Sequence, residues 1–126
     1  MAKLRIGVVG LGMGRHHARM FQSHPQAKLV ALADPEEARR KEVGSELGVK
    51  RLYPSLEAML AEEQLDVVSI ATPNRFHKPQ TIAALEAGAH VLCEKPLAMN
   101  STESAELVAL AKGRKQAAGV NYNIRY

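Results

Sequence analysis

Three closely spaced glycines follow the first strongly apolar run of the chain, and their type and spacing indicate chemistry. Gly10, Gly12 and Gly14 stand between a strand-like run over 4–9 and a helix-like pattern over 13–24. Glycine permits a tight turn, and it lets a phosphate group approach main-chain N–H groups at the positive end of a helix. The segment therefore predicts a loop that binds a dinucleotide pyrophosphate. A purely structural role stays open, because any strand-to-helix turn tolerates glycine.

The spacing of these glycines departs from the usual Gly-x-Gly-x-x-Gly pattern of dinucleotide-binding loops. Gly14 comes one residue early, and Arg15 stands where the third glycine is expected. The departure puts the geometry of the loop in question, but not the fold.

An acidic residue, Asp34, ends the next strand-like run, about 20 residues after the loop, where dinucleotide-binding folds hold the adenosine ribose. A carboxylate there accepts hydrogen bonds from ribose hydroxyls and repels a 2′-phosphate, which favours NAD over NADP. The alternative is a helix cap, with Pro35 at the first helical position and Glu37 completing a capping box. Arg39 either lies over the adenine, or steadies a 2′-phosphate, which keeps NADP possible, or occupies a solvated helix face.

Strand-like and helix-like segments alternate along the chain. The expected strands are 4–9, 28–33, 51–53, 66–71, 90–93 and 120–122. The expected helices are 13–24, 34–48, a small helix capped by Ser55, 77–87 and 100–118. This order predicts an α/β fold with a doubly wound, parallel six-stranded sheet and helices on both faces, the Rossmann fold. We expect residues 1–126 to form one such dinucleotide-binding domain.

Composition excludes several other classes of protein. The chain has 126 residues, of which 46% are hydrophobic and 24% charged, as in ordinary globular domains. Its +4 net charge comes from scattered basic residues, so we expect no nucleic-acid partner. No apolar run is long enough to span a membrane, and none resembles a signal peptide. With Cys93 as the single cysteine, we expect the protein in the cytoplasm.

Several residues that resemble chemical sites are better explained by packing. His16 and His17 are adjacent, so they point in different directions from a helix, and we expect no metal site. Ser69 lies within a strand without the context of a nucleophile. We expect Cys93 to be a small buried residue and His90 to be structural.

Two further segments carry a family resemblance. They are Thr72-Pro73-Asn74-x-x-His77 and the run 87–96, Ala-Gly-Ala-His-Val-Leu-Cys-Glu-Lys-Pro. With the preceding segments they resemble the N-terminal domain of the Gfo/Idh/MocA oxidoreductases, from Ile6 to Tyr126. The Glu-Lys-Pro element after a valine-rich strand is the most specific part of this resemblance.

The resemblance implies a role for each matching residue. Gly10, Gly12, Met13 and Gly14 would hold the pyrophosphate, and Asp34 the adenosine ribose. The remaining implied cofactor contacts are Thr72, Pro73, Asn74, His77, Glu94 and Lys95. Lys95 would also be catalytic, because an ammonium stabilises the alkoxide that develops when hydride leaves a carbinol. Whether the Lys95–Pro96 bond is cis or trans stays open.

The implied function is NAD-dependent hydride transfer, with NADP possible, at a secondary alcohol of a sugar, cyclitol or polyol. In the resembled family a C-terminal domain supplies the substrate pocket, and homo-oligomers usually assemble through that domain. We expect that domain to lie outside this chain, which alone would bind cofactor without turnover. The alternative is a non-catalytic NAD-binding module, acting as a sensor or subunit. A methyltransferase has no use for the Glu-Lys-Pro element.

Overall fold

The computed structural model describes residues 3–94 and 118–121 and forms a single parallel sheet with helices. The first half comprises β1 (Leu4–Val9), α1 (Gly14–Ser23), β2 (Ala27–Ala33), α2 (Glu37–Leu47) and β3 (Arg51–Tyr53). The second half comprises α3 (Leu56–Glu62), β4 (Val67–Ile70), a 3₁₀ turn η1 (Asn74–Phe76), α4 (His77–Glu86), β5 (His90–Glu94) and β6 (Ala118–Asn121).

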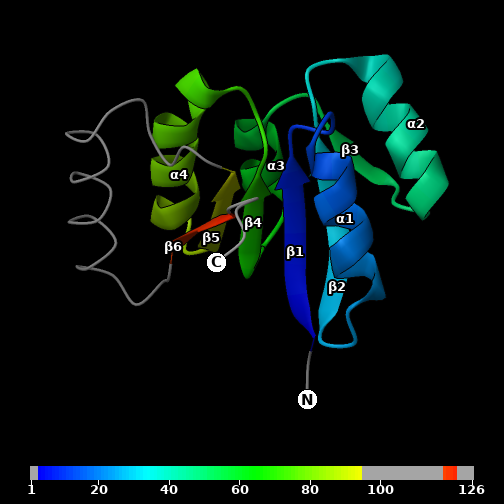
Figure 1. Ribbon diagram of the computed structural model, residues 1–126, viewed down its shortest axis with the longest axis horizontal. Helices are drawn as coiled ribbons and strands as arrows, with labels where there is room; N and C mark the ends of the chain where they lie inside the picture. Colours follow the sequence, from blue (N-terminus) through cyan, green and yellow to red (C-terminus); the bar gives the residue numbers. More distant parts are fainter. Residues whose placement is uncertain (1–2, 95–117, 122–126) are drawn as a thin grey trace.

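The sheet has the strand order β3-β2-β1-β4-β5-β6, and every neighbouring pair is parallel. Helices α1 and α2 contact each other on one face, and α3 and α4 contact each other on the opposite face (Figure 1). The chain builds outward from β1 in one direction and from β4 in the other. This arrangement confirms the doubly wound fold, and it places a switch point between β1 and β4.

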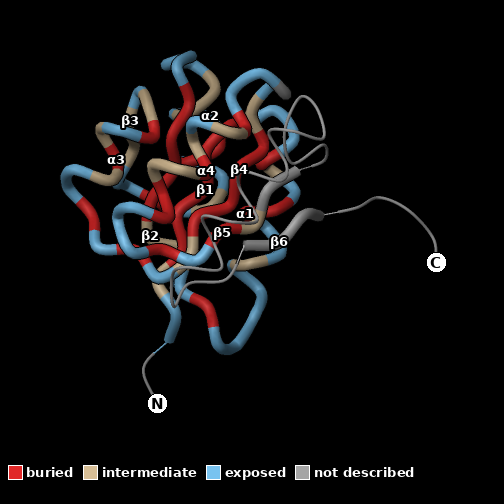
Figure 2. Tube along the Cα trace, turned by 90° about the vertical axis from the view of Figure 1, so that its left-hand side faces the viewer, coloured by how far each residue is buried: buried red, intermediate tan, exposed pale blue. Residues whose placement is uncertain are grey.

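The core has one apolar layer on each side of the sheet. Ile6 and Val8 of β1 pack toward α1 and α2, whereas Val9 packs toward α3 and α4. Figure 2 shows the buried segments running through the interior along the strands. Because the central strands are covered on both faces, their sequences are nearly continuous apolar runs rather than alternating ones.

Two of the predicted helix signals are confirmed. The Ser55 side chain accepts a hydrogen bond from the Ala58 amide and caps α3, whose Leu56 and Met59 are buried. Gly88 follows α4 with a φ of +92°, a left-handed conformation that favours glycine after a helix.

The predicted start of the second helix is wrong. The helix begins at Glu37, its N-cap is Glu36, and no side chain caps it. The Asp34 carboxylate instead accepts the Glu36 amide at 2.8 Å, which closes a turn ahead of the helix and leaves Pro35 outside it. Neither the Asp34 cap nor the box with Glu37 forms, because the Asp34 carboxylate is turned toward the glycine loop.

A polar cluster around Glu63 lies at the other end of the sheet from the carboxyl ends of the strands. The Glu63 carboxylate accepts hydrogen bonds from the Tyr53 hydroxyl and from Arg51 at 2.9 Å, with Arg5 at 3.3 Å. The hydrogen bond to Glu63 raises the pKa of the Tyr53 phenol above its ordinary value of 10.0. The cluster ties the end of α3 to β1 and β3.

The last strand starts two residues earlier than predicted, since Ala118 already belongs to β6. The rest of the helix predicted over 100–118 lies outside the described residues. Within the described ranges, no helix has the length and apolar character needed to cross a bilayer.

Candidate functional site

A cavity of about 1050 Å³ opens at the carboxyl ends of β1, β2 and β4, where doubly wound folds bind ligands. Residues that the sequence singled out line much of it: Gly10, Gly12, Met13, Asp34, Arg39, Thr72, Pro73 and His77. Other lining residues were not predicted, and they include Pro54, Ser55, Glu57, Arg75, Phe76, Pro79 and Gln80. These lie in segments after β3 and β4, and none of them was given a cofactor-binding role from the sequence.

Glycine is required at each of the three loop positions for a different physical reason. Gly10 has a φ of +87°, and a Cβ there would lie 2.7 Å from backbone atoms of Ala71 and Thr72. A Cβ on Gly12 would meet nothing within 4 Å, so the space above it is open to the cavity. A Cβ on Gly14 would lie 2.9 Å from Val8 Cγ1, so this glycine lets α1 pack closely on β1.

The early position of the third glycine therefore does not disturb its function. Close helix–strand packing is the role that the third glycine has in dinucleotide-binding loops, and Gly14 has it here. Gly14 also donates a hydrogen bond from its amide to the Gly10 carbonyl at 2.9 Å, which closes the loop tightly.

The first turn of α1 faces the same loop. Met13 is the N-cap, and no side chain of the described residues provides a cap hydrogen bond. Amide donors at an uncapped helix start, together with the helix dipole, favour an anion. The open space at Gly12 and this uncapped turn fit a pyrophosphate.

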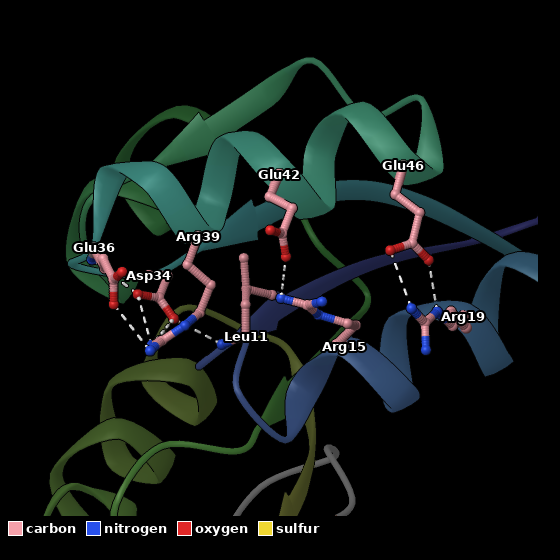
Figure 3. A network of polar contacts seen from close by, with 8 residues as sticks. All are labelled: Leu11, Arg15, Arg19, Asp34, Glu36, Arg39, Glu42 and Glu46. Atoms are coloured by element: carbon pink, nitrogen blue, oxygen red, sulfur yellow. Dashed lines mark hydrogen bonds and ion pairs between the residues drawn. The ribbon is translucent and has the colours of Figure 1, made fainter.

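Asp34 joins the tip of β2 to the glycine loop (Figure 3). Its buried carboxylate accepts the Leu11 amide at 2.8 Å through Oδ2 and the Glu36 amide at 2.8 Å through Oδ1. Asp34 lines the cavity, and a carboxylate oxygen can accept more than one hydrogen bond. It can therefore brace the loop and still accept a ribose hydroxyl.

Arg39 lies between two carboxylates on a helix face where its side chain is still 39% exposed. Its guanidinium is 3.3 Å from Asp34 Oδ2 and 2.9 Å from Glu36 Oε2 (Figure 3). These two negative groups offset the charge of the guanidinium.

Two more ion pairs join α1 to α2 behind the loop (Figure 3). Arg15 contacts Glu42 at 2.6 Å, and Arg19 forms a two-bond pair with Glu46. The hydrogen bond from Arg19 lowers the pKa of the Glu46 carboxyl. Because these pairs are solvent-exposed, we assign them a small share of the stability.

The segment after β4 is held by its own polar contacts. The buried His77 ring places Nε2 2.6 Å from the Thr72 carbonyl oxygen, so Nε2 is the protonated nitrogen that donates. The Thr72 hydroxyl donates to the Gln80 side-chain oxygen. These contacts fix the shape of the cavity wall, and His77 has this structural role in addition to lining the cavity.

Asn74, Glu94 and Lys95 complete the set of predicted cofactor contacts after β4 and β5. Asn74 lies in η1 and Glu94 ends β5, but their side chains are not described. Lys95 and Pro96 lie outside the described residues. The roles of all predicted residues as cofactor contacts stay predictions, although the structure brings eight of them to one cavity.

His17 has the packing role that the sequence predicts, and Ser69 is buried within its strand. The buried His17 places Nδ1 2.8 Å from the Ser69 hydroxyl, which joins α1 to β4, while His16 is exposed. No group of three metal-ligating side chains occurs in the parts of the chain that the structure describes.

Comparison with known proteins agrees with this geometry. The model of the Gfo/Idh/MocA proteins, described as an oxidoreductase family with an NAD-binding Rossmann fold, matches residues 4–122. The D-glucoside 3-dehydrogenase of Escherichia coli is 32% identical over 125 residues, covering 98% of this chain and 36% of that protein. An inositol 2-dehydrogenase of Corynebacterium glutamicum is 37% identical over 109 residues, covering 85% of this chain and 32% of that protein.

A solved structure is similar as well. The scyllo-inositol dehydrogenase of Lactobacillus casei, crystallised with NAD(H) and scyllo-inositol, superposes with a TM-score of 0.82 at 30% identity. The match covers 92% of this chain and 36% of that one. The chain thus spans about a third of the length of the relatives that it matches.

Proposed function

The chain belongs to the Gfo/Idh/MocA oxidoreductase family, and from that premise we propose that it is the cofactor domain of a dehydrogenase. The proposed substrate is a secondary alcohol of a sugar, cyclitol or related polyol, the class named for its relatives. The cofactor is NAD, in keeping with the NAD-binding Rossmann fold of the family. A non-catalytic module is not favoured, because the named relatives are dehydrogenases.

The observation that carries the proposal is the joint construction of the glycine loop and Asp34. An open space over Gly12, an uncapped helix start and a buried carboxylate bonded to Leu11 meet in one cavity. The loop amides suit two phosphates, and the carboxylate suits the neighbouring ribose hydroxyls. The two carboxylates around Arg39 disfavour a 2′-phosphate, so we assign NAD rather than NADP to this site.

NAD, when bound, supplies the hydride acceptor or donor. The chain would contribute Lys95, which follows the last residue of β5 in sequence. As a neutral amine it would take up the substrate hydroxyl proton, and the ammonium formed in this way would stabilise the substrate oxygen. Glu94 would line the cofactor beside it.

Substrate binding and turnover are proposed to require the further region that the relatives have, because this chain covers only 36% and 32% of the two named dehydrogenases. Homo-oligomers would assemble through that region, and we propose the cytoplasm as the location. In a protein that includes the region, Lys95→Ala should lose mainly turnover of a cyclitol, with a much smaller loss of NADH affinity.

Gly12→Val tests the cofactor assignment. A Cβ at Gly12 meets nothing within 4 Å, and its φ is not positive, so the variant should fold normally. The added side chain would fill the space assigned to the pyrophosphate, so NADH binding should fall below detection in a fluorescence titration. Gly12→Ala is the matched control with a smaller side chain and should give an intermediate loss. Unchanged NADH affinity in a folded Gly12→Val chain would refute the assignment.

A further inference from the structure

The two arginines that line the cavity differ in their partners. Arg39 is held by the carboxylates of Asp34 and Glu36. Arg75 takes part in none of the ion pairs found among the described residues, and its guanidinium carbon lies 4.6 Å above the centre of the Phe76 ring. The charge of Arg75 is therefore not offset by a carboxylate of the described chain, whereas that of Arg39 is.

The position of Arg75 decides which anion it meets. It lies in η1, in the segment that follows β4, and this segment starts against the glycine loop. A Cβ on Gly10 would touch the backbone of Ala71 at 2.7 Å, which shows how closely the two segments approach. Since β1 lies between β2 and β4, Arg75 is on the opposite side of the loop from Asp34. We therefore expect phosphates bound at the loop to lie nearer to Arg75 than an adenosine 2′-phosphate would.

The contact with Phe76 leaves the donors of Arg75 available. The guanidinium carbon lies over the Phe76 ring, and a cation–π contact requires no N–H···O hydrogen bond from the guanidinium. A planar fork of donors matches two oxygens of one phosphate, which a lysine ammonium cannot do.

We propose that Arg75, whose guanidinium lies over the Phe76 ring, is a pyrophosphate-binding residue that contacts phosphate oxygens across the cavity from the glycine loop. The inference rests on the proposed function, because it takes NAD as the ligand. In this proposal the two arginines of the cavity have different roles. Arg75 binds the phosphates, whereas Arg39 pairs with Asp34 and Glu36.

Titrations with NADH, ADP and adenosine test this assignment. They use the whole chain as wild type, Arg75→Gln and Arg75→Lys, with Lys50→Gln as control. Lys50 is exposed, lies outside the cavity and forms none of the ion pairs found among the described residues. The Lys50→Gln control therefore removes one positive charge, as Arg75→Gln does, but at a position outside the cavity. Calorimetry gives the affinities for NADH and ADP, ligand-observed NMR gives that for adenosine, and thermal melts check folding.

Arg75→Gln should weaken NADH and ADP by about tenfold, as loss of a charge-assisted contact does, and leave adenosine unchanged. Arg75→Lys should lose less affinity for NADH and ADP, because it keeps the positive charge but not the planar set of N–H donors. Lys50→Gln should bind both ligands like wild type. Added salt should reduce the difference in NADH and ADP affinity between wild type and Arg75→Gln, because it screens the charge of Arg75.

Two results would overturn the inference while leaving the proposed function standing. An equal loss for adenosine would mean that Arg75 stacks on the base, and unchanged ADP affinity would mean that it contacts no phosphate. A wild-type chain that does not bind NADH would overturn both proposals, so the two failures are distinguishable.

Discussion

Replacing Asp34 should weaken the fold as well as the cofactor site. Its carboxylate accepts two main-chain amides at 2.8 Å, one from Leu11 and one from Glu36, and the side chain is only 2% exposed. In Asp34→Ala both amides lose their acceptor. The Leu11 residue is fully buried, so water cannot replace the lost bond there, whereas Glu36 is exposed.

The expected magnitude follows from these two amides. A buried amide without a partner costs about 1–3 kcal/mol, and we place Leu11 in the upper part of that range. At the exposed Glu36, water replaces most of the lost hydrogen bond, so its cost is below about 1 kcal/mol. Asp34→Ala should therefore lower the free energy of unfolding by about 2–4 kcal/mol. For a domain of this size, that corresponds to a fall in melting temperature of about 6–20 °C.

Chemical denaturation and NADH and NADPH titrations of three variants would separate the roles of Asp34. Asp34→Asn keeps the shape and one acceptor oxygen, so its stability should lie between those of Asp34→Ala and wild type. Arg39→Gln removes the ion pair but keeps both amide bonds, so its stability should fall by less than about 1 kcal/mol. Both Asp34 variants should bind NADH more weakly and lose part of the preference for NADH over NADPH.

The stability result is the one that can refute the reasoning. An Asp34→Ala chain with a wild-type midpoint and slope would show that the Leu11 and Glu36 amides find other acceptors. An unchanged ratio of NADH to NADPH affinities would show that Asp34 braces the loop without selecting the cofactor.

Two further expectations follow from the geometry. Gly10→Ala should destabilise the domain by more than about 2 kcal/mol, because its φ is +87° and a Cβ would lie 2.7 Å from rigid backbone; a melt equal to that of Gly12→Ala would contradict this. The hydrogen bond to Glu63 raises the pKa of Tyr53 above its ordinary value of 10.0. Its contribution to stability is fully present below that ordinary value and is lost as the pH rises through the folded-state pKa. Tyr53→Phe should therefore lose less stability than wild type between neutral and strongly alkaline pH, as measured by urea midpoints; parallel curves would contradict the proposed hydrogen bond to Glu63.

The fold could be predicted almost completely from the sequence because its signals are local. Nearly continuous apolar runs such as 4–9 indicate strands covered on both faces, and glycines such as Gly88 end helices. The position of the glycine loop and of Asp34 followed from the same alternation. Family membership, which the sequence resemblance also predicted, is confirmed by the match over residues 4–122.

The contacts of the site were less predictable because they join distant parts of the chain. The Asp34 carboxylate bonds to Leu11, 23 residues earlier, and this contact exists only because β1 and β2 are neighbours. A sequence pattern around Asp34 indicates a helix cap equally well, and that prediction was wrong. The sequence likewise gives no signal for Arg75. The role that we propose for it depends on which carboxylates lie near each arginine in space.

The glycine loop shows why residue spacing alone is a limited guide to such a site. The third glycine is out of register with the usual pattern, yet a Cβ at Gly14 would press on Val8, as expected for a glycine that packs a helix on a strand. Gly12 has open space in front of it, and Gly10 has a positive φ against the Ala71 backbone. What identifies each glycine is therefore the atom that a side chain would strike: backbone at Gly10, a neighbouring side chain at Gly14, and at Gly12 only the volume that we assign to the cofactor.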